Sequence, residues 1–230
     1  MTLIGIAILP AAPVLVPGVS ATLPDGLRQV RDAAEACVGD LPDAEAVVLL
    51  AVGNPAGRYR RVEASLAGFG RPDLAVSLRP AGCAKGHDRA LPPALAVLAM
   101  MLRRHAPVAP IALDPGATAR DLHELGTGVA RCSRRIVAVA AGDLSAGLDE
   151  RSPRSCIDGA QAWDEAVLTA VVDGDLQALA RLGPVEARRV VAQGWAPVLA
   201  TVTAGVEAAL DLQLRHYSAP RGVGYLVASA

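Results

Sequence analysis

Lysine and aromatic residues are scarce in this chain of 230 residues. Aromatic side chains make up 3% of it and Lys85 is the single lysine, so arginine supplies nearly all of the positive charge. This bias is typical of a GC-rich, actinobacterial-type coding sequence, and the formal net charge is −1. Proteins that bind single-stranded nucleic acid combine a basic groove with aromatic rings that stack on bases. The composition therefore argues against nucleic acid as a partner.

Long apolar segments and paired cysteines are missing as well. No stretch of about 18 residues is apolar throughout without proline or charge, so no membrane partner is expected. The apolar run 3–9 has no basic leader and is followed at once by Pro10, which predicts a buried strand and not a signal peptide. The four cysteines show no C-x-x-C pair and no zinc-like spacing: Cys37, Cys83, Cys132 and Cys156. We expect free thiols and a cytoplasmic location.

Short apolar runs alternate with longer amphipathic ones along the chain. Apolar residues make up 52% of it, and this alternation is typical of an α/β fold whose strands are covered on both faces. We expect one domain, residues 1–230, with a mixed, mainly parallel sheet and helices on both faces. Strands are predicted at 3–9, 46–52, 74–78, 108–113 and 136–140, and a terminal hairpin at 213–217 and 222–228. Helices are predicted at 26–38, 93–105, 117–132, 159–172, 175–182, 184–193 and 196–210.

The loops after the strands hold the residues that could carry chemistry, because open α/β sheets bind ligands beyond the carboxyl ends of their strands. Residues 140–147 read A-A-G-D-L-S-A-G and place Asp143 and Ser145 after a buried strand. Residues 52–61 offer Arg58 beside glycines that allow close approach of the backbone to an anion. Structural roles as turn, cap or solvated residues remain open for both segments. Among the histidines, His87 next to Asp88 is the suggestive pair.

Five short motifs stand in these segments in order. Residues 10–17 read P-A-A-P-V-L-V-P, 52–54 read V-G-N, and 88–94 read D-R-A-L-P-P-A. Residues 141–146 read A-G-D-L-S-A and are followed by W-D-E-A-V at 163–167, while 218–228 read S-A-P-R-G-V-G-Y-L-V-A. Over nearly the whole chain these motifs resemble the B subunit of class III extradiol ring-cleavage dioxygenases and the related Memo-like proteins.

The resemblance implies an iron site whose ligands are missing here. In that family two histidines and a carboxylate hold Fe(II), which leaves open positions for the catechol oxygens and dioxygen. The two histidine-ligand positions carry Ala11 and Asn54, and the carboxylate position carries Ser218. The histidine of a D-H-G segment is replaced by Arg89, and a further histidine near the substrate by Ala146. Residues 1–86 and 124–215 contain no histidine, so a small shift of the alignment does not restore these ligands.

The resemblance therefore predicts a catalytically silent relative, a pseudoenzyme without metal or other cofactor. Such a protein would keep a strand-end pocket for a small, anionic ligand or for a protein partner. The expected ligand-binding residues are Asn54, Arg58, Asp88, Arg89, Asp143 and Ser145, and arginines 58, 89 and 151 are expected to point into the pocket.

Two other hypotheses stay open at this point. One is an Fe(II)-dependent extradiol dioxygenase whose metal is held by His87, Asp88 and His216 or by a completing subunit. The other is a different enzyme that uses Asp143, Ser145 and the 58–61 loop on an anionic substrate. The apolar composition also predicts exposed apolar surface, and with it a homodimer.

Overall fold

A seven-stranded sheet forms the centre of the computed structural model, which describes residues 2–82, 85–102 and 106–230. The strands follow the order β3-β6-β2-β7-β1-β9-β8. Their bounds are β1 Leu3–Leu9, β2 Ala46–Val52, β3 Gly57–Arg58, β6 Val108–Leu113, β7 Ile136–Ala141, β8 Gln213–Ser218 and β9 Tyr225–Ser229. β6, β2, β7 and β1 are parallel, whereas β3, β9 and β8 run antiparallel to their neighbours. The predicted α/β fold with a mainly parallel sheet and a terminal hairpin is confirmed.

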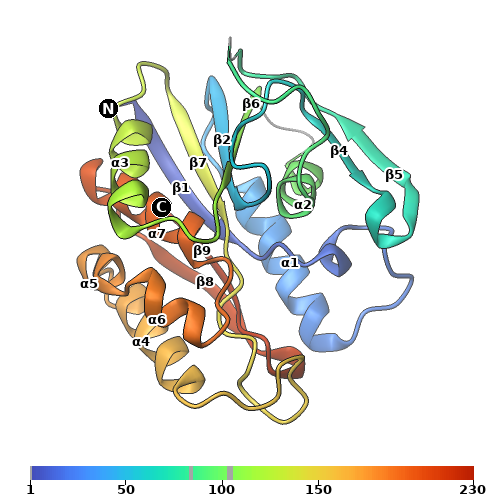
Figure 1. Cartoon of the computed structure of the whole chain (residues 1–230), viewed down its shortest axis with the longest axis vertical. Coiled ribbons are helices and arrows are strands. Elements are labelled where there is room, and N and C mark those ends of the chain that lie inside the picture. The colour runs from blue at the N-terminus through green and yellow to red at the C-terminus, as the bar shows by residue number, and fades with distance from the viewer. Residues whose placement is uncertain (1, 83–84, 103–105) are drawn as a thin grey trace.

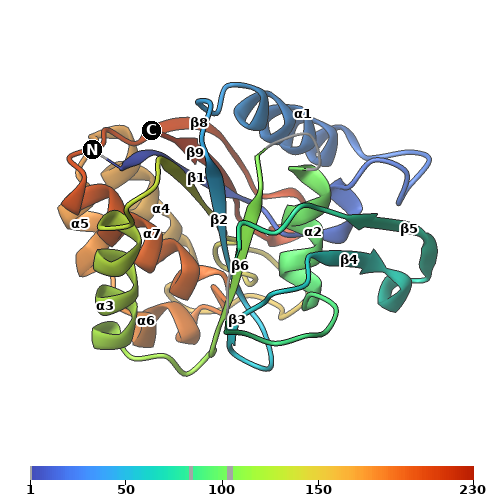
Figure 2. The ribbon, with the colours of Figure 1, turned by 90° about the horizontal axis from the view of Figure 1, so that it is seen from above.

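Helices cover both faces of this sheet (Figure 1). One face carries α1 Asp25–Gly39 and α2 Pro93–Met101. The other carries α3 Ala119–Ala130, α4 Ala160–Val172, α5 Leu176–Arg181, α6 Pro184–Arg189 and α7 Trp195–Glu207. Figure 2 shows the two layers on either side of the strands. Along β1, Ile6 and Ile8 pack into the layer of α7, while Ala7 and Leu9 pack into the layer of α2. Burial on both faces explains why the central strands are continuous apolar runs.

Two helices, α3 and α5, begin at residues whose side chains cap them. At α3, the side-chain oxygen of Thr118 accepts a hydrogen bond from Asp121 N (3.2 Å), and the Asp121 carboxylate accepts one from Thr118 N (3.0 Å). This reciprocal pair is a capping box. At α5, the Asp175 carboxylate accepts a hydrogen bond from Ala178 N (2.8 Å). The predicted helix 93–105 ends at Met101 in the structure, and its residues 103–105 lie outside the described residues.

The prediction that residues 74–78 form a strand covered on both faces is wrong. The segment belongs to β5 Arg71–Ser77, which pairs with β4 Glu63–Leu66 in a separate two-stranded sheet next to α2. Residues of β5 are half-buried or exposed, as in a strand with one side toward solvent. A short run of Leu, Ala and Val occurs both in strands covered on two faces and in strands with one side toward solvent, so it does not distinguish them. The partner strand β4 has no run of apolar residues.

The surface leaves few large apolar side chains uncovered. Among the described residues, the exposed ones are Phe69, Val172 and Val185, which lie on separate elements. The predicted apolar surface for a homodimer is therefore scattered, and the homodimer itself stays a prediction. No helix in the described part of the chain combines the length and the apolar character that crossing a membrane requires.

Candidate functional site

Two of the sequence motifs pair with each other at the carboxyl edge of the sheet. Residues 142–148, which follow β7, run alongside residues 222–225, which lead into β9. Leu144 N donates a hydrogen bond to Gly224 O (2.8 Å), Gly224 N donates to Ser145 O (2.9 Å), and Leu148 N donates to Gly222 O (3.1 Å). The A-G-D-L-S-A and G-V-G-Y motifs thus form one hydrogen-bonded unit. We call these two segments together the strap.

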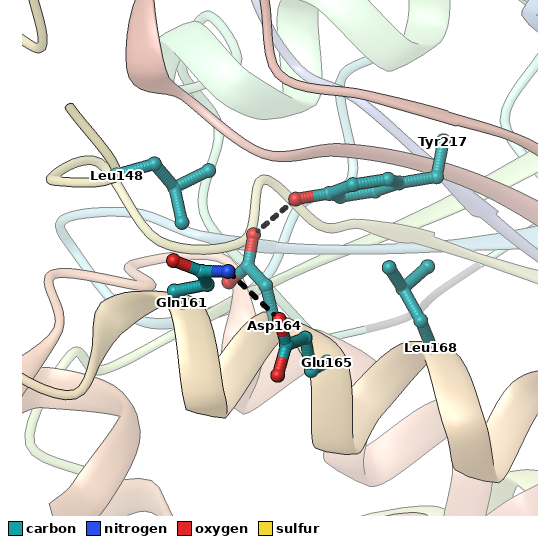
Figure 3. Close-up of a pocket in the computed structure, with 6 residues that line it drawn as sticks. All are labelled: Leu148, Gln161, Asp164, Glu165, Leu168 and Tyr217. Atoms are coloured by element: carbon teal, nitrogen blue, oxygen red, sulfur yellow. Dashed lines mark hydrogen bonds between the residues drawn. The ribbon is translucent and has the colours of Figure 1, made fainter.

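Asp164, on α4, anchors the strap from the side of the helix layer (Figure 3). Its Oδ1 accepts a hydrogen bond from Ser145 N (3.1 Å), and its Oδ2 accepts one from Tyr217 OH (2.8 Å). The side chain is 2% exposed, and burial raises the pKa of its carboxyl in spite of these two bonds. Gly224 passes so close that a Cβ atom there would collide with Asp164 Oδ2. Asp164 therefore joins α4, β8 and the strap.

A small cavity of about 270 Å³ lies beside this anchor (Figure 3). Its polar groups are already bonded to one another, because Gln161 Nε2 donates to Glu165 Oε1 (2.9 Å) and Tyr217 donates to Asp164. Burial and the neighbouring Asp164 raise the pKa of Tyr217, so its hydroxyl stays a neutral donor at neutral pH. We assign this cluster a structural role.

Asp143 lines a different cavity, which we call the strand-end cavity. It has a volume of about 280 Å³ and lies where β1, β2 and β7 end. Asp143 Oδ1 accepts a hydrogen bond from Ala11 N (3.2 Å), which ties the strap to the end of β1. The neighbouring wall combines the three strand ends with the loop before α7: Ala11, Val52, Ala141, Gln193 and Gly194. A Cβ atom at Gly194 would lie 2.5 Å from Asp143 N, so this close approach requires glycine.

Burial changes the pKa values of two residues at the strand-end cavity. The burial of Asp143 raises the pKa of its carboxyl to about 6, and the hydrogen bond from Ala11 N lowers it again in part. Tyr225 forms a backbone bridge with Asp143, and burial together with the charge of Asp143 raises the pKa of Tyr225 to about 12. Among the described lining residues no basic side chain faces Asp143. At pH 7.5 the cavity therefore presents a carboxylate that a ligand could neutralise.

Replacing Asp143 with asparagine should change how stability depends on pH. Because the folded pKa of about 6 lies above the ordinary value of 3.8, the aspartate contributes stability below about pH 4 that is lost as pH rises through about 6. From pH 4 to pH 7, the stability of Asp143→Asn relative to wild type should therefore rise by on the order of 2 kcal/mol. Urea unfolding at several pH values measures this difference. A constant difference would show that Asp143 titrates normally.

The structure distributes the six predicted ligand-binding residues over several places. Asp143 lines the strand-end cavity, and Ser145 is fully buried in the strap. Arg58 lines a separate cavity next to α3. Asp88 forms an ion pair with Arg60 (3.3 Å) in an exposed loop that also carries Arg89, and Asn54 is exposed after β2.

The remaining positions singled out from the resemblance have ordinary partners. Ser218 Oγ lies 3.0 Å from His216 Nε2 on β8, and Ala146 N donates a hydrogen bond to Val190 O (3.3 Å). His87 Nε2 lies 2.9 Å from Ala56 O, and its ring packs against that of Tyr59 at a tilt of 53°, with 5.1 Å between centroids.

The hypothesis of a metal shared by His87 and His216 is contradicted by the sheet order. His87 bridges to Tyr59 beside β3, whereas His216 lies on β8, and β3 and β8 are the two outer strands. One ion cannot bind both. Within residues 2–82, 85–102 and 106–230, no three His, Cys, Asp or Glu side chains are arranged to hold a metal ion.

Sequence reasoning did not identify Asp164, Gln193 and Gly194 as site residues. Asp164 carried a signal, since it stands on the buried face of α4 with Ala160, Val167 and Val171, and a charged residue there calls for a buried partner. Nothing in the sequence indicated that Gln193 and Gly194 line the cavity, because the sequence does not show which strand ends the loop between α6 and α7 lies against.

No family model matches the chain, and no curated protein matches it in a sequence search. Among solved structures, the chain is similar to the crystal structure of an uncharacterized protein from Escherichia coli K12. The two share 18% identity over 98% of each chain, with a TM-score of 0.57. At this identity the likeness shows a common fold and nothing about the activity of either protein.

Proposed function

We propose that the chain is a catalytically silent relative of the class III extradiol dioxygenases that binds a small molecule in the strand-end cavity. The observation that carries this proposal is the position of the cavity at the carboxyl ends of β1, β2 and β7, with the half-buried Asp143 in its wall. Open α/β sheets bind their ligands at this edge. Typical ligand cavities have volumes of about 300–1,000 Å³, so this one suits a small compound or the end group of a larger one.

The chemistry of the lining favours a ligand with a hydrogen-bond donor or a positive charge. Asp143 is the single charged residue among the described lining residues, and an anion would be repelled by it. The arginines expected to attract an anion do not line this cavity, and Arg151 instead pairs with Asp149 (2.9 Å). The proposed ligand is therefore an amine or an alcohol, in place of the anion that the sequence suggested.

The proposal that the protein is catalytically silent is based on the residues around Asp143. The family places a histidine ligand where Ala11 stands, and Ala11 lines the cavity. Among the described lining residues Asp143 has neither an imidazole nor a second carboxylate beside it, and a 2-His-1-carboxylate iron site needs all three groups.

Binding of butylamine tests the ligand proposal. Wild-type protein should bind it at pH 7.5 in a saturable way in ligand-observed NMR, and binding should weaken as pH falls through about 6 because Asp143 becomes protonated. Asp143→Asn should lose binding, whereas Asp158→Asn, at an exposed position in the same loop, should keep it. Butyrate, which has the opposite charge, should not compete.

An iron-binding experiment on the same protein sample tests the proposal that the protein is catalytically silent. After incubation with Fe(II) without oxygen and passage over a desalting column with chelator, it should retain no stoichiometric iron and should not oxidise catechol when air is admitted. Equimolar iron with catechol turnover would contradict the proposal, and equal amine binding by wild type and Asp143→Asn would contradict the assignment of the cavity.

A further inference from the structure

A second and larger cavity adjoins the strand-end cavity, with which it shares Val52 and Gln193. Its volume is about 590 Å³, within the range of about 300–1,000 Å³ that is usual for small-molecule sites. Most of its wall comes from α6, the start of α7 and the loop between them, and residues from two other loops, Pro115 and Arg154, complete it. We call it the arginine cavity.

The lining of the arginine cavity separates into apolar walls and two positive charges. Ala187, Val191 and Trp195 contribute to the walls, and the charged residues are Arg154 and Arg188. Among the described lining residues none is acidic. Both arginines are exposed, which places their guanidinium groups where the cavity meets solvent.

Neither guanidinium group has a protein partner in the described part of the chain, because the side chains of Arg154 and Arg188 form no ion pair or hydrogen bond there. Two arginines close to them in sequence do: Arg151 pairs with Asp149 (2.9 Å) and Arg181 with Asp175 (3.7 Å). The guanidinium groups at the cavity are thus available to an external anion, and planar guanidinium groups match carboxylates and phosphates well.

The apolar walls are held in place before any ligand binds. Trp195 Nε1 donates a hydrogen bond to Leu182 O (2.6 Å), and the Trp195 ring packs edge-on against Trp163 at 5.1 Å between centroids. Val191 has a φ of +58°, a left-handed conformation that is costly for a β-branched residue. Such conformations persist where the surrounding structure imposes them, often at ligand sites.

We propose that the arginine cavity binds an amphiphilic organic anion. Its apolar part would pack against the half-buried Val191 and the exposed Pro115, and its carboxylate or phosphate would bind Arg154 and Arg188. The two cavities share Val52 and Gln193, but the proposed ligands have opposite charges, and Arg154 and Arg188 bind the anion whereas Asp143 binds the amine. The experiments on this cavity therefore test a proposal that does not depend on the amine site at Asp143.

Calorimetric titration with octanoate, octyl phosphate and octan-1-ol tests the proposal. Octanoate should bind in a saturable way, at least about tenfold more tightly than octan-1-ol, and raising NaCl from about 50 to about 500 mM should weaken octanoate alone. The double variant Arg154→Gln/Arg188→Gln should weaken octanoate by about tenfold or more and leave octan-1-ol unchanged. If octyl phosphate binds more tightly than octanoate with the same loss in the double variant, the ligand is a phosphate ester. The reverse order assigns a carboxylate.

Arg189→Gln is the matched control, because Arg189 follows Arg188 on α6 and is exposed but does not line the cavity. It should bind octanoate like wild type. Both variants should keep the wild-type unfolding temperature, since the substituted side chains are exposed. Equal affinities for octanoate and octan-1-ol, the same loss in Arg189→Gln, or no saturable octanoate binding would each overturn the proposal.

Discussion

Replacing Asp164 with alanine should lower the free energy of unfolding by about 3 kcal/mol. The substitution removes the acceptor for Ser145 N and for Tyr217 OH, and an unsatisfied buried donor costs about 1–3 kcal/mol. The raised pKa of Asp164 shows that burial disfavours its charge, so removing that charge returns part of the loss. Urea unfolding at pH 7 measures the net effect.

Two further variants make this prediction specific. Glu165→Ala changes the next residue of α4, which is exposed, and should alter stability little. Tyr217→Phe removes one of the two hydrogen bonds and should cost about 1 kcal/mol. If Asp164→Ala does not fold, Tyr217→Phe still reports on the anchor. A loss for Asp164→Ala no greater than for Glu165→Ala would show that the strap does not depend on it.

Two glycines of α3 should respond to the same substitution with opposite signs. A Cβ atom at Gly126 would collide with Ala200 O of α7 and lie 2.7 Å from Thr203 Cβ, so Gly126→Ala should destabilise the protein by about 3 kcal/mol. At Gly128 no atom lies within 4 Å of such a Cβ. Gly128→Ala should therefore stabilise the protein by about 0.5–1 kcal/mol, because alanine loses less backbone entropy in a helix.

Thermal unfolding of the two single variants measures this contrast. Each serves as the control of the other, since residue type, helix and substitution are the same. Destabilisation of equal size at both positions would mean that α3 does not tolerate alanine for reasons other than its contact with α7.

The central strands could be read from the sequence because each is a continuous apolar run with a sharp end. The predicted bounds 3–9, 46–52 and 108–113 coincide with β1, β2 and β6, which are followed by Pro10, Gly53 and Asp114. β3 and β4 gave no such signal. β3 has two residues and pairs at the outer edge of the sheet, and β4 alternates with polar residues.

The site could be predicted only in part, because its contacts join residues far apart in sequence. The apolar strand before Asp143 predicted that this residue lies at the carboxyl edge of the sheet, and it does. Its contact with Ala11 spans 132 residues, and no local pattern encodes it. Arg58 was expected beside Asp143, but β3 is separated from β7 by β6 and β2. The order of strands in the sheet, which the sequence does not state, decides which loops meet.

That order also has a consequence during synthesis of the protein. β1 leaves the ribosome before the other strands of the sheet, yet its two neighbours are β7 and β9, which are made much later. The nascent chain must carry the apolar strand Leu3–Leu9 with both edges unpaired until Ile136–Ala141 and then Tyr225–Ser229 emerge. Such distant pairing slows folding and exposes the growing chain to aggregation. The strap, and with it the strand-end cavity, therefore closes only after residues 222–225 have emerged.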